Sequence, residues 1–538
     1  MSGPKSSAAT GRRRVADAPV ILVPLDASAP APLYRQLYDG LREAILAGRF
    51  PPRARVPSTR VLAADLGVAR NTVVLAYDQL RTEGYLEGTR GGGSRVRATI
   101  PDRLLHVGPT RRRSPGEAPA TRPPKTSAPT HESPSHSPAR VSARGAMLVD
   151  AGRSFAQRGR TAPRTFRLGV PALDAFPARL WARLTARGWR DGAVALGDGD
   201  PLGEPALRDA IASYVTTSRG ARCTTDQVFI VNGTQHALDL VARVLLDPGD
   251  AVWVEDPGYL GARAALAAAG ARIVPVRVDE HGLDVAEGEH ASPGARLAYV
   301  TPSHQFPLGA VMSAPRRLAL LAWARRARAW IVEDDYDSEF RYVGRPLPCL
   351  QGMDAAGAVD GEGARVLYVG TFNKTLVPGI RLGYLVVPEP LVDAFHGARA
   401  ATDRHTGTFV QNVLADFIGE GHYARHLRRV RALYAERQRA LLDAVNETMP
   451  DLLTMSPDAA GLHLVGWLPP GMDDDRATEL ALREGVETFP LSRFAFGPTP
   501  VMERGALLLG YAAFDPREVR DGIRRLRRGF QGVRVVEK

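Results

Sequence analysis

The sequence predicts two folded units of different class, a mainly helical unit with a short β-hairpin and a larger α/β unit. At 538 residues the chain is too long for one compact core. Residues 108–146 contain eight prolines and no Phe, Trp or Tyr, and such a segment cannot bury enough surface to fold. Beyond it, short apolar runs alternate with longer helical patterns, which is typical of an α/β unit.

These boundaries give the expected organisation. We expect a mobile basic tail at 1–30, a helical unit at 31–100 and a Pro-rich linker at 101–150. The α/β unit is expected at 151–538, with a large part at about 165–388 and a small part at about 389–538. Nearly all of the net charge of +12 lies in residues 1–150, which carry 23 Lys and Arg against 12 Asp and Glu. That asymmetry indicates a polyanion partner for the first part alone.

Composition also indicates the cellular compartment of the protein. Its two cysteines, Cys223 and Cys349, have no His or Cys neighbours at metal-ligand spacing, so we expect neither a metal site nor a disulfide framework. No apolar run approaches the ~18 residues that a membrane helix needs. The short apolar stretch after the N-terminal arginines is interrupted by Asp and Pro, unlike a signal peptide. We therefore expect a cytoplasmic protein with no membrane partner.

The first unit shows three helical patterns in succession. Leu37, Leu41 and Ile45 share one helical face. Ser58 is a good N-cap for a short helix over Thr59–Leu66 that Gly67 closes. A third helix is expected from about Arg70 to Glu83. Two short helices joined by a tight turn that contains glycine form the helix-turn-helix pattern.

A two-stranded wing is expected after the third helix, with glycines at its tip that let backbone N–H groups approach phosphate. The segment PSTRVLAADLGVARNTVVLAYDQLRTEGYLEGTRGGGSRV closely resembles the winged-helix domain of GntR-family regulators. This resemblance and the exposed start of the third helix imply a double-stranded DNA operator as partner. The candidate DNA-binding residues are Arg60, Arg70, Asn71, Thr72, Arg90, Gly92 and Arg95. Ala69 departs from the serine N-cap that the family often has.

The second unit contains seven apolar, β-rich runs. They are Gln227–Val231, Ala251–Val254, Arg272–Val276, Leu297–Val300, Trp330–Glu333, Val366–Val369 and Leu382–Val387. Apolar strands separated by helices predict a mostly parallel sheet that helices cover on both faces. Ligands bind such sheets at the carboxyl ends of their strands.

Lys374 is the natural place to look for amine chemistry. It is the only lysine between residue 126 and the C-terminal residue, and it follows a predicted strand in the segment GTFNK. A lysine there can form a Schiff base with an aldehyde, whereas arginine stays protonated. Thr371 and Arg381 offer the hydroxyl and the cation that a cofactor phosphate requires.

Other candidate cofactor-binding residues occur in a consistent order along the chain. Gly233, Thr234 and Gln235 lie between a strand and a helix, where backbone N–H groups can hold a phosphate. Tyr259 could stack on a pyridine ring, and Asp334 could pair with a pyridinium nitrogen.

This order resembles fold-type I aminotransferases, and its combination with a GntR domain resembles the MocR/GabR subfamily of regulators. The resemblance implies pyridoxal 5′-phosphate as cofactor, Lys374 as its Schiff-base partner, Tyr336 at the ring oxygen and a homodimer. Asp335 is a less favoured alternative to Asp334.

Several positions depart from the aminotransferase pattern. Phe306 stands where many aminotransferases have an Asn that contacts the ring, which leaves Gln305 or His304 as substitutes. Asp198 stands where relatives often have a Tyr, and Leu508 where true aminotransferases bind the substrate carboxylate with Arg. These departures favour a regulator that senses pyridoxal phosphate or a small amine or amino acid. The alternative is a catalytically active aminotransferase (a transferase) with an accessory DNA-binding domain, in which another Arg such as Arg493 takes the carboxylate.

Overall fold

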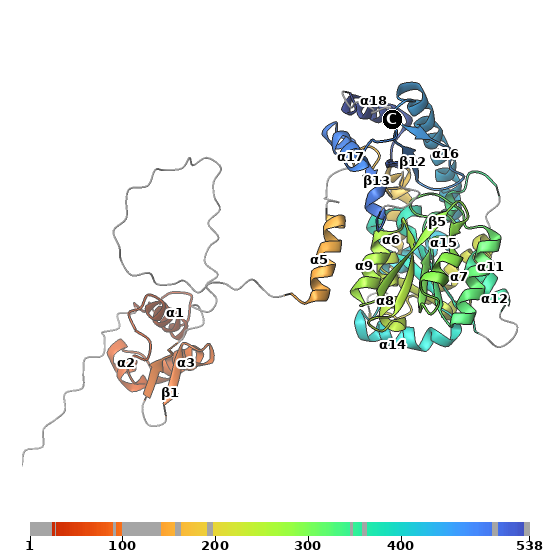
Figure 1. Cartoon of the computed structure of the whole chain (residues 1–538). Coiled ribbons are helices and arrows are strands. Elements are labelled where there is room, and N and C mark those ends of the chain that lie inside the picture. The colour runs from red at the N-terminus through yellow and green to blue at the C-terminus, as the bar shows by residue number, and fades with distance from the viewer. Residues whose placement is uncertain are drawn as a thin grey trace, which may run out of the picture. The chain divides into compact units, whose positions relative to one another are not determined.

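The computed structural model describes residues 24–26, 28–89, 93–98, 141–156, 163–190, 197–344, 348–357, 363–497 and 504–531. The chain divides into two compact units, Met1–Ser133 and Pro134–Lys538 (Figure 1). Of the expected Pro-rich linker, residues 101–140 lie outside the described residues. Its last residues belong to helix α5 (Ala143–Ala156), which packs against α9 (Leu260–Ala268) of the second unit.

The first unit consists of three helices and a β-hairpin. These are α1 (Leu33–Leu46), α2 (Thr59–Leu66), α3 (Arg70–Thr82), β1 (Leu86–Thr89) and β2 (Gly93–Val96). The two strands are antiparallel and pair from Leu86 opposite Val96 to Thr89 opposite Gly93. The expected helix-turn-helix and wing are both confirmed.

Local side chains define the ends of α2. The Ser58 side chain accepts a hydrogen bond from the Val61 backbone N–H, and Gly67 ends the helix in the left-handed conformation at φ 64°. Ala69, in contrast, gives α3 no side-chain cap. The three helices enclose a core of their own that includes Leu37, Leu41, Leu62, Val73, Tyr77 and Leu80.

The second unit is built on an eight-stranded sheet with the strand order β3-β10-β9-β8-β7-β4-β5-β6. Its strands are β3 (Val228–Val231), β4 (Ala251–Asp256), β5 (Arg272–Asp279), β6 (Gly282–Leu283), β7 (Leu297–Val300), β8 (Trp330–Asp335), β9 (Val366–Thr371) and β10 (Gly383–Val386). From β9 to β5 all neighbours are parallel. The mostly parallel sheet is thus confirmed, but β10 runs antiparallel to both β3 and β9.

Helices cover this sheet on both faces (Figure 1). They are α7 (Pro205–Arg219), α8 (Thr234–Leu245), α9, α10 (Val285–Ala291), α11 (Ala314–Ala327), α12 (Leu350–Gly357), α13 (Phe372–Thr375) and α14 (Val392–Thr402). Strand side chains alternate between two apolar cores. Val252 and Val332 pack with α8 and α9 on one face, whereas Trp253 and Ile331 pack with α11 on the other.

The last part of the chain forms a smaller sheet with the order β11-β12-β14-β13. Its strands are β11 (Thr454–Met455), β12 (His463–Trp467), β13 (Phe489–Pro490) and β14 (Ala506–Gly510). The helices α16 (His422–Thr448), α17 (Asp474–Arg483) and α18 (Pro516–Gly529) accompany it, whereas α6 (Ala178–Arg190) and α15 (Thr408–Gly419) pack against each other, and α15 also contacts α7. Within the described ranges, no helix combines the length and the apolar character needed to cross a membrane.

Candidate cofactor-binding and DNA-binding sites

A cavity of about 510 Å³ lies where β3, β7, β8 and β9 end, and it is lined by residues from both the large and the small sheet regions. Lys374 enters it from α13, the short helix that directly follows β9. The Lys374 Nζ donates a hydrogen bond to the backbone oxygen of Gly169 at 2.8 Å. A primary amine is thus held at the carboxyl edge of the parallel strands, where ligands bind in this fold class.

Asp334 lies at the end of β8 and is 3% exposed. Its Oδ2 accepts a hydrogen bond from the Tyr299 hydroxyl at 2.7 Å, while its buried Oδ1 has no hydrogen-bond partner among the described residues. Burial raises the pKa of Asp334 to about 7, against the lowering effect of the Tyr299 hydrogen bond. An unpartnered carboxylate oxygen of this kind is suited to a buried cationic N–H.

Two aromatic side chains line the same cavity. Tyr336 follows Asp334 by two residues, and its hydroxyl lies 3.0 Å from His304 Nδ1. Tyr259 precedes α9, and its ring meets that of Phe306 edge to face with centroids 6.0 Å apart. An aromatic ring bound between these residues would find both a stacking surface and a hydroxyl.

A cradle for an anion lies at the start of α8. Gly233 is its N-cap at φ 87°, and a side chain there would place its Cβ 2.9 Å from Asn373 Nδ2. Thr234 and Gln235 begin the helix, so their backbone N–H groups face the region that a phosphate would occupy. The Gln235 side chain itself is engaged, since its Nε2 donates to the backbone oxygen of Gly261 at 2.9 Å.

Thr371 and Arg381 complete this cradle from the other side. The Thr371 hydroxyl accepts a hydrogen bond from the Asn373 backbone N–H at 3.2 Å and caps α13. Arg381 donates to the backbone oxygen of Asn232 at 3.0 Å from a left-handed position at φ 56°. A hydroxyl, a guanidinium and a helix N-terminus therefore converge on one place, and such groups bind phosphate.

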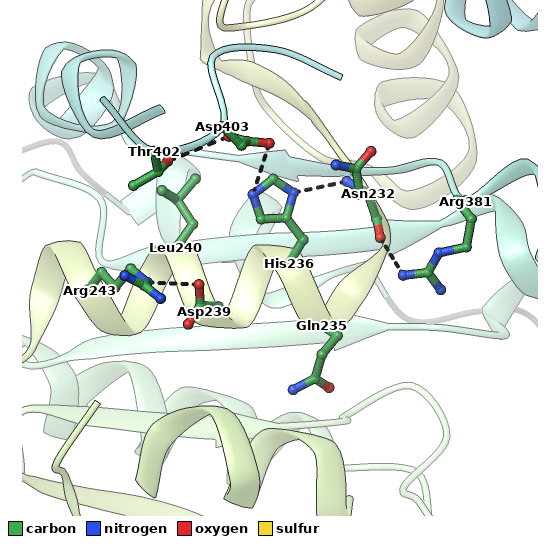
Figure 2. A pocket seen from close by; sticks show the side chains of 9 residues that line it. All are labelled: Asn232, Gln235, His236, Asp239, Leu240, Arg243, Arg381, Thr402 and Asp403. Carbon is green, nitrogen blue, oxygen red and sulfur yellow. Dashed lines mark hydrogen bonds and ion pairs between the residues drawn. The ribbon is translucent and has the colours of Figure 1, made fainter. Parts of the chain in front are cut away.

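A second cavity of about 600 Å³ adjoins this cradle (Figure 2). Figure 2 shows Arg381 and Gln235 beside His236, whose Nδ1 accepts from the Asn232 backbone N–H at 3.1 Å. Gln235 and Arg381 line both cavities, but Lys374 and Asp334 line only the first. The first cavity is therefore the candidate cofactor site.

The residues around that cavity fit pyridoxal phosphate. The group carries an aldehyde, an aromatic ring nitrogen and a phosphate, and the cavity offers Lys374, the unpartnered oxygen of Asp334 and the Gly233 cradle in its wall. The sequence predictions thus converge on one cavity. Tyr299, which hydrogen-bonds Asp334, was missed because it sits in an ordinary apolar strand, and Gly169 because it lies 205 residues from Lys374.

The departures from the aminotransferase pattern have clear structural consequences. Leu508 is fully buried in β14 and packs with Leu491 and Phe494. Neither Gln305 nor His304 is among the described residues that line the cavity, and Gln305 Nε2 instead donates to the backbone oxygen of Pro257 at 2.9 Å. Asp198 is highly exposed, and its Oδ1 lies 3.9 Å from His405 Nε2.

Arg493 is an arginine of the small part that lines the cavity. Its guanidinium lies 6.0 Å from the centre of the Phe489 ring. Arg167 also lines the cavity but lies 3.5 Å from a carboxylate oxygen of Glu487. Arg493 has no carboxylate within 4.0 Å in the part of the chain that the structure describes.

The candidate DNA-binding residues lie on the surface of the first unit. Arg60 is exposed on α2, and Arg70 and Asn71 are exposed at the first turn of α3, where Thr72 is half-buried. The Arg70 guanidinium lies 3.5 Å from the Thr59 hydroxyl. Arg95 is half-buried on β2. Arg90 and Gly92, predicted at the wing tip, lie outside the described residues.

Fold and sites together define a DNA-binding regulator that carries a unit with the fold of pyridoxal-phosphate-dependent aminotransferases. Residues 33–96 match the model of bacterial regulatory proteins of the gntR family, and residues 186–526 match aminotransferase class I and II. The chain belongs to the MocR-type branch of the GntR family of transcription regulators. It is 43% identical over 507 residues to the probable rhizopine catabolism regulatory protein MocR of Rhizobium meliloti, with 94% of this chain and 95% of the relative covered.

Solved structures match the second unit. An archaeal alanine:glyoxylate aminotransferase superposes with a TM-score of 0.65 at 25% identity and covers 73% of this chain and 98% of its own. The α-aminoadipate aminotransferase LysN of Thermus thermophilus, solved with N-(5′-phosphopyridoxyl)-L-leucine, gives 0.62 at 29% identity and covers 70% and 97%. The fold-type I architecture and pyridoxal 5′-phosphate as its cofactor are therefore confirmed.

Proposed function

We propose that this regulator senses a small amine or amino acid, or pyridoxal phosphate itself, in the cavity that Lys374 enters, and that it responds by changing its contacts with operator DNA. The observation that carries the proposal is the joint presence in one cavity of an amine, that of Lys374, and a buried carboxylate oxygen, that of Asp334, which has no hydrogen-bond partner among the described residues. When bound, pyridoxal phosphate supplies an aldehyde that condenses with amines.

Each side chain has a proposed part in holding the cofactor. Lys374 would hold the cofactor at its aldehyde, and Asp334 would accept a hydrogen bond from the ring N–H. Tyr336 donates to the ring oxygen, and Tyr259 covers one ring face. Gly233, Thr234, Gln235, Thr371 and Arg381 hold the phosphate, the first three through the start of α8.

Arg493 has the proposed role of binding an anionic group of the effector. Among the described residues, three arginines line the cavity. Arg381 belongs to the phosphate cradle and Arg167 lies beside Glu487, so within that set Arg493 is the arginine available to a ligand. We therefore expect an effector with an amine at one end and an acid group at the other. Replacing Arg493 with Met should weaken such an effector more than an uncharged amine of the same length.

In the first unit, Arg60, Arg70, Asn71, Thr72, Arg90, Gly92 and Arg95 are the proposed DNA contacts. We expect the regulator to act in the cytoplasm and to form a homodimer. The two DNA-binding units of a dimer imply palindromic or direct-repeat half-sites in the operator. An effector that binds two dimer arrangements unequally would shift the population between them.

A mobility-shift assay with the region upstream of its own gene tests DNA binding. Specific binding that survives Arg70→Ala combined with Arg95→Ala would contradict these contacts.

A second candidate function is catalysis by an aminotransferase, which the position of Arg493 in the cavity favours as a site for the substrate carboxylate. The purified protein mixed with amino acids and oxo acids distinguishes the two. Multiple turnovers support catalysis, whereas a stoichiometric change in the visible spectrum supports sensing.

A further inference from the structure

His304 occupies a buried position between two carboxylates from different parts of the second unit. Its Nδ1 lies 3.0 Å from Asp337 Oδ2, and its Nε2 lies 3.0 Å from Asp458 Oδ2. The side chains of His304 and Asp337 are each 1% exposed. Asp337 follows β8 in the large part, whereas Asp458 lies between β11 and β12 in the small part. The imidazole therefore joins the two parts.

Both ring nitrogens face an acceptor, so the arrangement requires a doubly protonated ring. A neutral imidazole would turn a lone pair toward one of the two carboxylates. Burial alone would lower the pKa of His304, but the attraction and hydrogen bonds of Asp337 and Asp458 outweigh it and raise the pKa to about 10. The pKa of Asp458 is lowered by the same contact, against the raising effect of its burial.

The surroundings of His304 leave little room for another arrangement. Tyr336 and His463 are further titratable neighbours of His304. The ring centroids of His463 and His304 lie 5.7 Å apart, and burial and the charge of His304 lower the pKa of His463. Gly461 has φ 96°, and a side chain at this position would collide with the His304 ring.

The charge of His304 has a consequence for Tyr336. The Tyr336 hydroxyl also lies 3.0 Å from His304 Nδ1. Nδ1 of an imidazolium carries one proton and no lone pair, so Asp337 and Tyr336 can only share that proton as acceptors, and the Tyr336 hydroxyl cannot donate to this nitrogen. Because Tyr336 also lines the candidate cofactor cavity, its hydroxyl proton is then available to an acceptor bound there.

We propose that His304 is a positioning residue that directs the Tyr336 hydroxyl proton into the cofactor cavity, and that Asp458 makes this direction depend on the docking of the small part. The loop of Asp458 is tied to the large part by two backbone hydrogen bonds, from Tyr342 to Ala459 at 2.7 Å and from Gly461 to Phe340 at 3.0 Å. A movement of the small part that breaks these two bonds would separate Asp458 from His304 and remove one of the two carboxylates that keep the imidazole protonated. The inference rests on the proposed cofactor site. It means that a movement of the small part would change the hydrogen bonding that Tyr336 offers to the cofactor.

The test is a pH titration of the visible absorption of the full chain loaded with pyridoxal phosphate, for the native protein, His304→Gln and Asp458→Asn. A donor at the ring oxygen and a nearby cation both stabilise the deprotonated chromophore, so losing them should raise its midpoint by about one pH unit. His422→Gln is the matched control, because His422 also lies 3.0 Å from a carboxylate, that of Glu420, but at the surface. The control should leave the midpoint unchanged.

A lower melting temperature with an unchanged midpoint in both His304→Gln and Asp458→Asn would show that His304 has only a structural role and would overturn the proposal. ¹⁵N NMR of labelled histidine in the cofactor-free full chain separates this outcome from failure of cofactor binding. The signal that disappears in His304→Gln should show a protonated ring at pH 7. A neutral ring at that pH overturns the proposal, whereas a colourless native protein with a protonated ring refutes only the proposed cofactor site.

Discussion

Replacing Arg60 with Ala and replacing Arg70 with Ala should affect DNA binding differently, because the two side chains lie on different helices of the helix-turn-helix. Arg60 is exposed on α2, the helix that crosses the DNA backbone in this motif, whereas Arg70 is exposed at the start of α3, the helix that enters the major groove. Arg60 should therefore contact phosphate and Arg70 a base edge.

The magnitudes follow from that assignment. Each phosphate contact contributes about 0.9 to the slope of log affinity against log salt. In the proposed dimer, the loss of two copies of Arg60 should thus reduce the slope by about 1.8, equally on operator and unrelated DNA. Arg70→Ala should cost about 1–3 kcal/mol per contact on the operator and leave binding to unrelated DNA nearly unchanged.

Fluorescence anisotropy with labelled operator and scrambled duplexes, measured from 50 to 200 mM salt, provides the assay. Arg476→Ala is the control, since this exposed arginine lies in the small part and pairs with Glu479 at 3.0 Å. Equal salt slopes in Arg60→Ala and the native protein would refute the phosphate contact. An operator preference that survives Arg70→Ala would refute the base contact.

Three further predictions concern stability and the cofactor. Lys374→Ala should abolish both the visible absorption band and borohydride labelling, and labelling of the variant at another residue would contradict the assignment. Because burial raises the pKa of Asp334 to about 7, the folded cofactor-free protein binds a proton that the unfolded chain releases, so this group destabilises the fold as pH rises from about 4 to 7. A cationic ring N–H offsets that loss, and the rise in melting temperature on loading should be larger at pH 7.5 than at pH 5.5, a difference that Asp334→Asn should remove. Ser58→Ala should destabilise the first unit by about 1 kcal/mol, measured by urea unfolding, whereas Ser58→Asp, which keeps an acceptor at the N-cap, should not.

Sequence patterns predicted those parts of the molecule whose causes are local. The bounds of α2 follow from Ser58 and Gly67, which cap its two ends. Lys374 stands out because arginine replaces lysine at nearly every other basic position. The strands of the large sheet follow from their apolar, β-branched composition.

The contacts that sequence reasoning missed join segments far apart in the chain. The direction of β10 depends on its pairing with β3, about 150 residues earlier, and an apolar run does not encode direction. Asp458 reaches His304 across 154 residues; His304 lies in the segment already compared with the aminotransferase pattern, but no pattern in the sequence pointed to Asp458 as its partner. Arg493 could be named as a candidate, but only the folded cavity shows that it faces the same space as Lys374.

The reversed strand β10 also constrains how the protein matures during synthesis. It lies between β3, which leads to Gly233, and β9, which leads to Lys374, so the anion cradle and the reactive amine become neighbours only after residues 383–386 have paired. The first unit has its own apolar core within residues 37–96 and can fold long before that. A ribosome-bound nascent chain will therefore acquire its DNA-reading surface first and its capacity to capture vitamin B6 hundreds of residues later.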